Sequence, residues 1–310
     1  MEVLALCPGS LATGGTEGIH NLVRELNKHA DINASIWYIN GEPPKEFAEY
    51  KCDYTLRLPD EFDGALIFPE VWANKITQSP YREFTVAVNW QGVDVYNWHT
   101  PEAERGRFLQ RKDAIHIVGS EYAKDFLQQF GIKPLKVSDC INKEFLAVDY
   151  EGVQRSNVVL YNPIGVKLTK FQRAVMARCT TELGIQFHPL EGYTRQELIE
   201  IFKHSKLYID FGVFSGRERL PREAVMCGCC ILTSKLGTAG YFKDNSIPDE
   251  YKLDNIDRAI QMIDHILRHY NLYKADFDFY RQCLKTDAEI KYPEEVKELG
   301  DALLNHYTSV

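Results

Sequence analysis

A dense group of charged residues follows a short apolar segment in the second half of the chain. In the stretch FGVFSGRERLPREAV, residues 211–225, three arginines and two glutamates occur within seven residues. The preceding run KLYID, residues 206–210, predicts a buried strand, and Pro221 is typical of the first turn of the helix that would follow. The charges would therefore surround the N-terminus of a helix, which favours anions.

Arginines and a glutamate at such a helix N-terminus could bind a nucleoside diphosphate. The guanidinium groups would hold the diphosphate, and Glu223, expected in the first helical turn, could accept hydrogen bonds from two ribose hydroxyls. The three arginines are Arg217, Arg219 and Arg222. The alternative is an internal salt-bridge cluster, in which Arg217 or Arg219 pairs with Glu218.

Two lysines could add positive charge to the same site. YNP, residues 161–163, ends another expected strand, and Lys167 and Lys170 follow it in the loop or in the first helical turn. A lysine beside a helix N-terminus could neutralise a diphosphate. The alternative is that both are ordinary surface lysines.

A glycine-rich turn follows the first expected strand, VLALC (3–7). Gly14 and Gly15, in PGSLATGGTEG (8–18), would let backbone N–H groups approach a phosphate or a sugar. The spacing matches neither GxGxxG nor a P-loop, which argues against a nicotinamide dinucleotide and ATP. A tight turn without a ligand is the alternative.

Polar residues also follow two later strands of the first half. Glu70 ends FPE (68–70), and Asp94 ends NWQGVD (89–94). A carboxylate at a strand end could orient a sugar hydroxyl or act as a base, and the aromatic and amide groups beside it suit contact with a carbohydrate. Surface or capping carboxylates are the alternative.

Apolar segments of strand length alternate with amphipathic segments of helical length along most of the chain. The expected strands are 3–7, 34–39, 65–69, 84–90 and 114–120 and, after residue 155, 157–163, 185–190, 206–212 and 229–234. This alternation favours parallel sheets in doubly wound α/β domains. The two series predict two domains, residues 1–152 and 153–310. From about Asp254 we expect only helices, and this tail could pack on the second domain or cross back to the first.

The composition favours a globular protein of the cytoplasm. With 310 residues and 45% hydrophobic residues, the chain exceeds what one core usually organises. No apolar run reaches the ~18 residues of a membrane span, and the start of the chain lacks a basic leader. Of the eight cysteines only Cys227, Cys229 and Cys230 cluster, which is too few for the four ligands of a zinc site, so we expect reduced core thiols and no metal site. The net charge of -8 gives no support to broad nucleic-acid binding.

The blocks described above resemble glycosyltransferases of the GT-B fold, over about residues 1–250. In their retaining group, a second-domain motif has a glutamate, seven residues, a second glutamate and a run of small residues. EAVMCGCCI (223–231) matches the later half, so the family's second glutamate falls on Glu223 and its first on Ser215, where this chain departs from the pattern. Softer matches are FPE, NWQGVDVYNW (89–98), GSEYAKDFL (119–127), SDCINKEF (138–145) and YNP.

The resemblance implies two Rossmann-like domains facing a cleft, the first binding the acceptor and the second, which carries the helical tail, binding a nucleotide sugar. A UDP-sugar is the expected donor and a glycan or polysaccharide hydroxyl the expected acceptor. The lysines and arginines would stabilise the departing diphosphate without a metal or a further cofactor. If the reaction inverts the anomeric centre, Glu70, Asp94 or His20 is the candidate base; if it retains it, the leaving phosphate itself could serve.

Three alternatives belong to other classes of function. The first is a sugar-nucleotide epimerase or hydrolase on the same fold, and the second is a non-catalytic sugar-nucleotide-binding protein. The third is a transferase that glycosylates a modified base in phage-type DNA, which rests on the basic residues Arg105, Arg107, Arg111 and Lys112. For a lipid-linked acceptor, a peripheral contact with the membrane would suffice.

Overall fold

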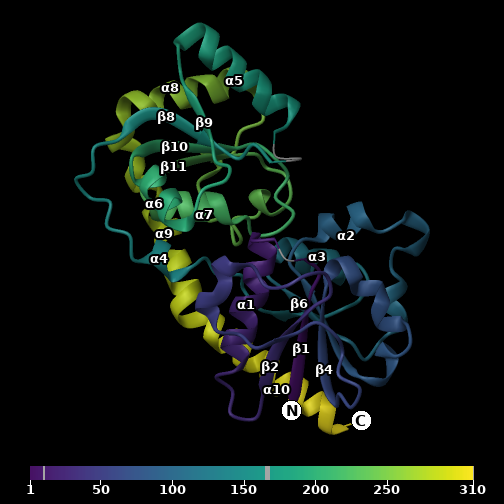
Figure 1. The fold of residues 1–310 in the computed structure, drawn as a ribbon. Helices are drawn as coiled ribbons and strands as arrows, with labels where there is room; N and C mark the ends of the chain where they lie inside the picture. The colour runs from purple at the N-terminus through teal and green to yellow at the C-terminus, as the bar shows by residue number, and fades with distance from the viewer. Residues whose placement is uncertain (10, 165–167, 310) are drawn as a thin grey trace. The chain divides into compact units, whose positions relative to one another are not determined.

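The computed structural model describes residues 1–9, 11–164 and 168–309. The chain forms two compact units: residues 1–140 together with 289–310, and residues 141–288 (Figure 1). Each unit contains one β-sheet whose strands are joined by helices. We describe the units separately.

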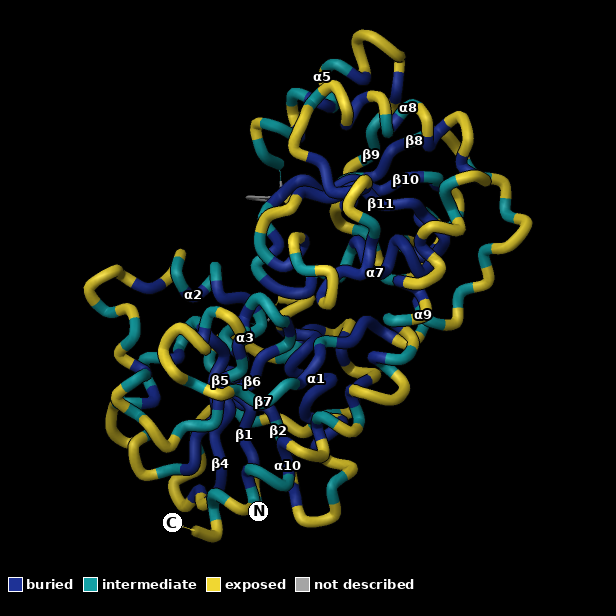
Figure 2. The backbone as a smooth tube through the Cα atoms, turned by 180° about the vertical axis from the view of Figure 1, so that it is seen from behind, coloured by how far each residue is buried: buried dark blue, intermediate teal, exposed yellow. Residues whose placement is uncertain are grey.

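The first unit is built on a seven-stranded sheet in the order β3-β2-β1-β4-β5-β6-β7, and every neighbouring pair is parallel. The strands are β1 (Glu2–Cys7), β2 (Asn33–Tyr38), β3 (Tyr54–Thr55), β4 (Gly64–Pro69), β5 (Thr85–Trp90), β6 (Ile115–Val118) and β7 (Leu135–Lys136). The central strands β1, β4 and β5 are almost wholly buried, as Figure 2 shows, which is expected of a parallel sheet covered on both faces.

Four α-helices belong to the part of this unit that the structure describes: α1 (Gly14–Leu26), α2 (Val93–His99), α3 (Glu121–Gln128) and α10 (Tyr292–Ser309). The Thr13 side chain caps α1 by accepting a hydrogen bond from the backbone N–H of Thr16. α10 lies against α1, β4 and β5, and the Glu295 carboxylate accepts the backbone N–H of Ser138 at 2.6 Å.

The second unit is built on a four-stranded parallel sheet in the order β11-β10-β8-β9. The strands are β8 (Ser156–Tyr161), β9 (Phe187–Pro189), β10 (Ser205–Asp210) and β11 (Cys230–Thr233). The helices are α4 (Lys143–Leu146), α5 (Lys170–Leu183), α6 (Arg195–Lys203), α7 (Arg219–Met226), α8 (Ile256–Tyr273) and α9 (Asp278–Thr286). Cys227, Cys229 and Cys230 lie in the core as free thiols, and burial raises the pKa of Cys229 to about 12.

The predicted fold class is confirmed: two parallel α/β sheets and a helical C-terminal tail. The units divide after Cys140, twelve residues before the expected boundary, because Ile141 and Phe145 pack in the core of the second unit. The tail follows both paths that the sequence left open. α8 and α9 pack on the second unit, a π-helix (Asp287–Lys291) follows α9, and α10 packs on the first unit.

Candidate functional site

The charged stretch follows β10 and leads into α7, at the carboxyl edge of the second sheet. β8 and β10 are parallel neighbours, with Tyr161 opposite Ile209, so the segments that follow the two strands emerge side by side. Lys170, exposed, is the first residue of the helix after β8. Ligands of open α/β sheets bind at this edge. Lys167 lies outside the described residues.

Side chains from neighbouring segments hold the loop 211–218. Gln172, in the first turn of α5, accepts the backbone N–H of Phe211 at 2.9 Å. Ser234, just after β11, donates to the carbonyl of Gly212 at 2.7 Å. These bonds satisfy backbone groups that no strand or helix pairs.

A glycine brings the segment after β11 against the same loop. Gly237 forms a parallel bridge with Phe214 and has a φ of +65°, and a Cβ there would lie 2.1 Å from the Phe214 carbonyl oxygen. The neighbouring Thr238 donates its hydroxyl to the carbonyl of Gly216 at 2.6 Å. Only glycine permits this approach.

Two of the three arginines are buried and contact the protein itself. Arg217, with 4% of its side chain exposed, forms an ion pair with Asp287 at 2.8 Å. Arg222 donates Nε to the carbonyl of Glu218 at 2.9 Å and Nη2 to the carbonyl of Arg217. Arg217 therefore forms an internal ion pair, but its partner is Asp287, 70 residues along the chain, and not the Glu218 considered from the sequence.

Glu223 and Arg219 lie on α7 itself. The helix begins at Arg219, earlier than Pro221 led us to expect, so Glu223 falls in the second turn and not in the first. Glu223 is 6% exposed, whereas Arg219 is only partly buried. Both follow β10 directly, on the edge that also carries Lys170.

Asp210 is a residue of this edge that sequence reasoning missed. It ends β10 and is almost wholly buried. Its Oδ1 accepts the backbone N–H of Gly212 at 3.0 Å, and its Oδ2 accepts the hydroxyl of Tyr208 at 3.3 Å. The apolar run KLYID ends in this aspartate, and a charged residue that closes a buried strand was the available signal.

In the first unit, Glu70 lies at the carboxyl end of β4 and is 6% exposed. Burial raises the pKa of its carboxyl to about 7, although backbone N–H groups of residues 70, 91 and 92 that bond to it lower the value. The Gln91 N–H is 3.3 Å from Oε2 of Glu70. A carboxyl that titrates near neutral pH at a strand end is suited to accept a proton.

Gln91 also connects this carboxyl to the glycine turn. Its side-chain Nε2 donates to the carbonyl of Gly15 at 3.3 Å, in the first turn of α1, which begins at Gly14. A Cβ on Gly15 would lie 3.3 Å from Oε1 of Gln91. The structure thus brings Gly14, Gly15 and Glu70 together through Gln91, one of the amide groups that the sequence suggested for contact with a carbohydrate.

His20 and Asp94 have other partners. The His20 ring is buried, with Nδ1 2.9 Å from the carbonyl of Thr16 and Nε2 3.1 Å from the hydroxyl of Tyr38. A carbonyl only accepts, so Nδ1 carries the proton and Nε2 accepts from Tyr38; burial lowers the pKa of the ring. Asp94, in the first turn of α2, accepts the hydroxyl of Tyr122 at 3.1 Å.

The basic segment 105–112 is partly structural. Arg111 donates to the carbonyls of residues 76, 81 and 84 and pairs with Asp113 at 2.9 Å. Arg105 donates to the carbonyl of Asn97 at 2.8 Å. Arg105, Arg107 and Lys112 are exposed, whereas Arg111 is partly buried. The observation that motivated a DNA acceptor is therefore reduced to three exposed side chains.

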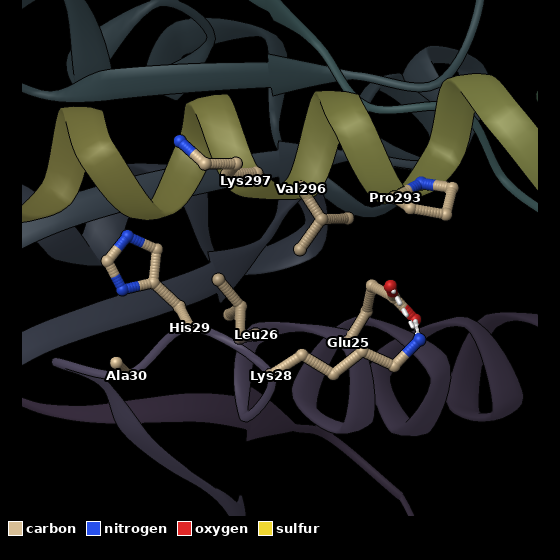
Figure 3. Close-up of a pocket in the computed structure, with 8 residues that line it drawn as sticks. All are labelled: Glu25, Leu26, Lys28, His29, Ala30, Pro293, Val296 and Lys297. Atoms are coloured by element: carbon tan, nitrogen blue, oxygen red, sulfur yellow. Dashed lines mark hydrogen bonds and ion pairs between the residues drawn. The ribbon is translucent and has the colours of Figure 1, made fainter.

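A cavity of about 540 Å³ lies between α1 and α10 of the first unit (Figure 3). Leu26 and Val296 face each other across its middle, and the Glu25–Lys28 ion pair lies at one end. Because α1 runs back from the carboxyl edge, its last turn lies at the opposite edge of the sheet. The cavity contains none of the predicted site residues.

No protein-family model and no curated protein matches the chain. Solved structures do. A glycosyltransferase from Rickettsia africae has a TM-score of 0.69 and 12% identity over 98% of both chains. Anabaena HepE, in complex with UDP and glucose, has a TM-score of 0.72 and 10% identity over 100% of both chains. S. aureus TarM, in complex with UDP among other ligands, has a TM-score of 0.57 and 14% identity; the matched part is 78% of this chain and 55% of that one.

These likenesses, together with the two parallel sheets, define a GT-B fold. A UDP-N-acetylglucosamine 2-epimerase is also similar, with a TM-score of 0.58 and 14% identity over 100% of this chain and 97% of that one. At such identities the likeness establishes the fold and not the reaction. No helix in the described part of the chain is both long and apolar enough to span a membrane.

Proposed function

We propose that this protein is a glycosyltransferase that moves a sugar from a nucleotide-sugar donor, a UDP-sugar, to a hydroxyl of a glycan or polysaccharide. The observation that carries the proposal is the held loop 211–218 at the carboxyl edge of the second sheet, with Glu223 on the helix that follows. The similar structures with UDP bound support the choice of donor.

In this proposal Glu223 binds the donor ribose, and Lys170 and Arg219 approach the diphosphate, with Lys167 as a further candidate. Arg217 and Arg222 act through the loop, because their guanidinium groups already bind Asp287 and backbone carbonyls. Positive charge at the diphosphate stabilises the departing UDP, which is the part of the transition state that gains charge. The match of 223–231 to the motif of the retaining group supports a metal-independent reaction of that kind, with inversion, in which a side chain takes the proton of the acceptor hydroxyl, as the alternative.

Glu70 is our first candidate to contact the acceptor hydroxyl, ahead of Asp94 and His20. Its carboxyl titrates near neutral pH and lies beside the glycine turn through Gln91. Both nitrogens of His20 are engaged, so this ring is the least suited of the three to take a proton.

A thermal-shift screen over UDP-, GDP-, ADP- and CMP-sugars tests the donor site. We expect one donor class, the UDP-sugars, to raise the Tm, and Glu223→Ala to abolish the shift. Glu200→Ala, on an exposed face of α6, is the matched control and should leave the shift unchanged. An undiminished shift in Glu223→Ala would contradict the ribose assignment.

The likeness to an epimerase supports a second candidate, and incubation with labelled UDP-N-acetylglucosamine without an acceptor separates the two. An epimer, or free sugar and UDP, would favour the epimerase or hydrolase. Donor binding without turnover in the presence of any glycan would favour a non-catalytic binding protein. Turnover with hydroxymethylated DNA, with affinity that falls steeply with salt, would favour the DNA acceptor.

A further inference from the structure

Two consecutive residues of the loop 211–218 are connected to the helical segment that ends the second unit. At the first, the carbonyl of Gly216 accepts the hydroxyl of Thr238 at 2.6 Å. Asn245 donates to the carbonyl of Thr238 at 2.9 Å and accepts the hydroxyl of Tyr280, on α9, at 3.0 Å. A chain of hydrogen bonds thus connects Gly216 to α9.

Arg217, the second of these two residues, contacts the same helical segment directly. Its Nη2 donates to Oδ2 of Asp287 at 2.8 Å, and the side chains are 4% and 12% exposed. Asp287 is the first residue of the π-helix, and the second unit ends one residue later, at Ala288. π-Helical turns often occur at functional positions.

The ion pair has more influence on the loop than a surface pair would. A buried guanidinium without a carboxylate is strongly unfavourable, and Nε of Arg217 has no hydrogen-bond partner among the described residues. Asp287 is the carboxylate that hydrogen-bonds Arg217 inside the unit, and the buried Asp244 adds a weaker favourable charge. If Arg217 moved outward, the backbone of 216–218, to which Arg222 also bonds, would move with it.

We propose that Asp287 is a positioning residue for the nucleotide-sugar site: through Arg217 it holds the loop 211–218 in the shape that binds the donor. The inference rests on the proposed function, because that function identifies the ligand. The Arg217–Asp287 ion pair does not depend on it. Because linkage is reciprocal, a nucleotide that binds this loop also stabilises the start of the π-helix.

The test compares Asp287→Asn with the wild-type protein in the full chain. We expect amide hydrogen exchange of residues 211–218 to become faster, and the Kd for UDP, measured by calorimetry, to rise by about tenfold, as it would if only about a tenth of the molecules kept the loop in its binding shape. Asp287→Glu, which keeps the charge, should recover part of the affinity. Asp254→Asn, at an exposed position of the same unit, is the matched control and should change neither quantity.

A double substitution, Arg217→Leu with Asp287→Leu, separates positioning from stability. Replacing both members of a buried pair by apolar residues often preserves stability. We therefore expect this variant to regain the wild-type Tm but not the wild-type affinity for UDP. Recovery of both would overturn the proposal, because the pair would then only stabilise the fold.

These experiments distinguish a failure of the positioning role of Asp287 from a failure of the proposed donor site. Should the double variant not fold, the comparison of Asp287→Asn with Asp287→Glu decides. Unchanged exchange of 211–218 in Asp287→Asn would refute the inference even if the wild-type protein binds UDP. Faster exchange in a protein whose wild-type form binds no UDP would support the contact and refute the proposed donor site.

Discussion

The backbone N–H of Gln91 lies 3.3 Å from Oε2 of Glu70 and donates to it. This bond joins the end of β5 to the end of β4, two neighbouring parallel strands. The bond holds the Glu70 carboxylate at the edge of the sheet. It does not fully offset the cost of burying a charge, since burial still raises the pKa of Glu70 to about 7. Glu70 is therefore protonated in part at neutral pH.

The raised pKa of Glu70 predicts a pH dependence of stability. In the unfolded chain the carboxyl loses its proton near its ordinary pKa of 4.5, whereas in the folded protein it keeps the proton up to about 7. Stability from this group is present below 4.5 and is lost as the pH rises through 7, by on the order of 3 kcal/mol. In Glu70→Gln this loss should be absent, so urea unfolding of wild type and variant should diverge between pH 4.5 and 7.5.

Glu61→Gln, at an exposed position of the same unit, is the control and should follow the wild-type pH profile. A Glu70→Gln profile parallel to that of the wild type would show that Glu70 titrates normally.

The same carboxyl predicts the pH profile of the transfer reaction. If the reaction inverts the anomeric centre, Glu70 as the base must be ionised, so kcat/KM should rise with pH through a midpoint near 7. Glu70→Gln should then lower kcat by ~10²- to 10⁴-fold, the usual contribution of a general base, whereas the loss should be smaller in a retaining reaction, where the leaving phosphate takes the proton. If Glu70→Gln retains activity and Asp94→Asn loses it, the base is Asp94.

Much of the fold could be predicted because parallel strands are continuous apolar runs. All nine expected strands form, including KLYID as β10 and CCILTS as β11. The strands β3 and β7, of two residues each, were missed because they are too short for a period to be visible. The path of the tail could not be predicted. The amphipathic sequence of α10 indicates that one face of the helix is buried, but not against which unit.

The candidate site could be predicted only for residues whose place at the carboxyl edge of a sheet follows from the order of strands and helices along the chain. A strand followed by a helix places Lys170, Glu223 and Gly15 at a carboxyl edge, and that needs no knowledge of distant contacts. The role of Arg217 depended on Asp287, which lies 70 residues along the chain. No local pattern distinguishes an arginine that binds a ligand from one that binds a distant carboxylate.

Gly15→Ala tests whether the glycine turn serves function and not stability. Alanine favours a helix over glycine by roughly 0.5–1 kcal/mol, so the Tm should not fall. The added Cβ would lie 3.3 Å from Oε1 of Gln91 and displace it by a few tenths of an ångström. We expect activity to fall several-fold, less than the ~100-fold of a 1 Å misplacement. Gly9→Ala, where a Cβ meets nothing within 4 Å, should leave activity unchanged.

Arg111→Lys tests the structural role of the basic segment. A lysine cannot donate in fixed directions to the three carbonyls that Arg111 binds, and buried carbonyls would lose their partners. We expect a loss of about 2 kcal/mol in urea unfolding, against less than about 0.5 kcal/mol for Lys112→Ala at the exposed neighbour. Equal stability of the two variants would show that Arg111 has no structural role, and Arg111 would then be a candidate to bind an anionic acceptor.

Gly237→Ala should destabilise the second unit more than an ordinary glycine substitution at positive φ. A positive φ alone costs roughly 1–2 kcal/mol for alanine, and this cost also applies to Gly192→Ala, where φ is +76° and a Cβ meets open space. At Gly237 the Cβ would also lie 2.1 Å from the Phe214 carbonyl oxygen, so the backbone of the loop 211–218 must shift. We expect Gly237→Ala to lose more stability than Gly192→Ala in urea unfolding and, unlike it, to weaken UDP binding. If both variants bind UDP as the wild type does, the bridge between residues 214 and 237 does not shape the donor site.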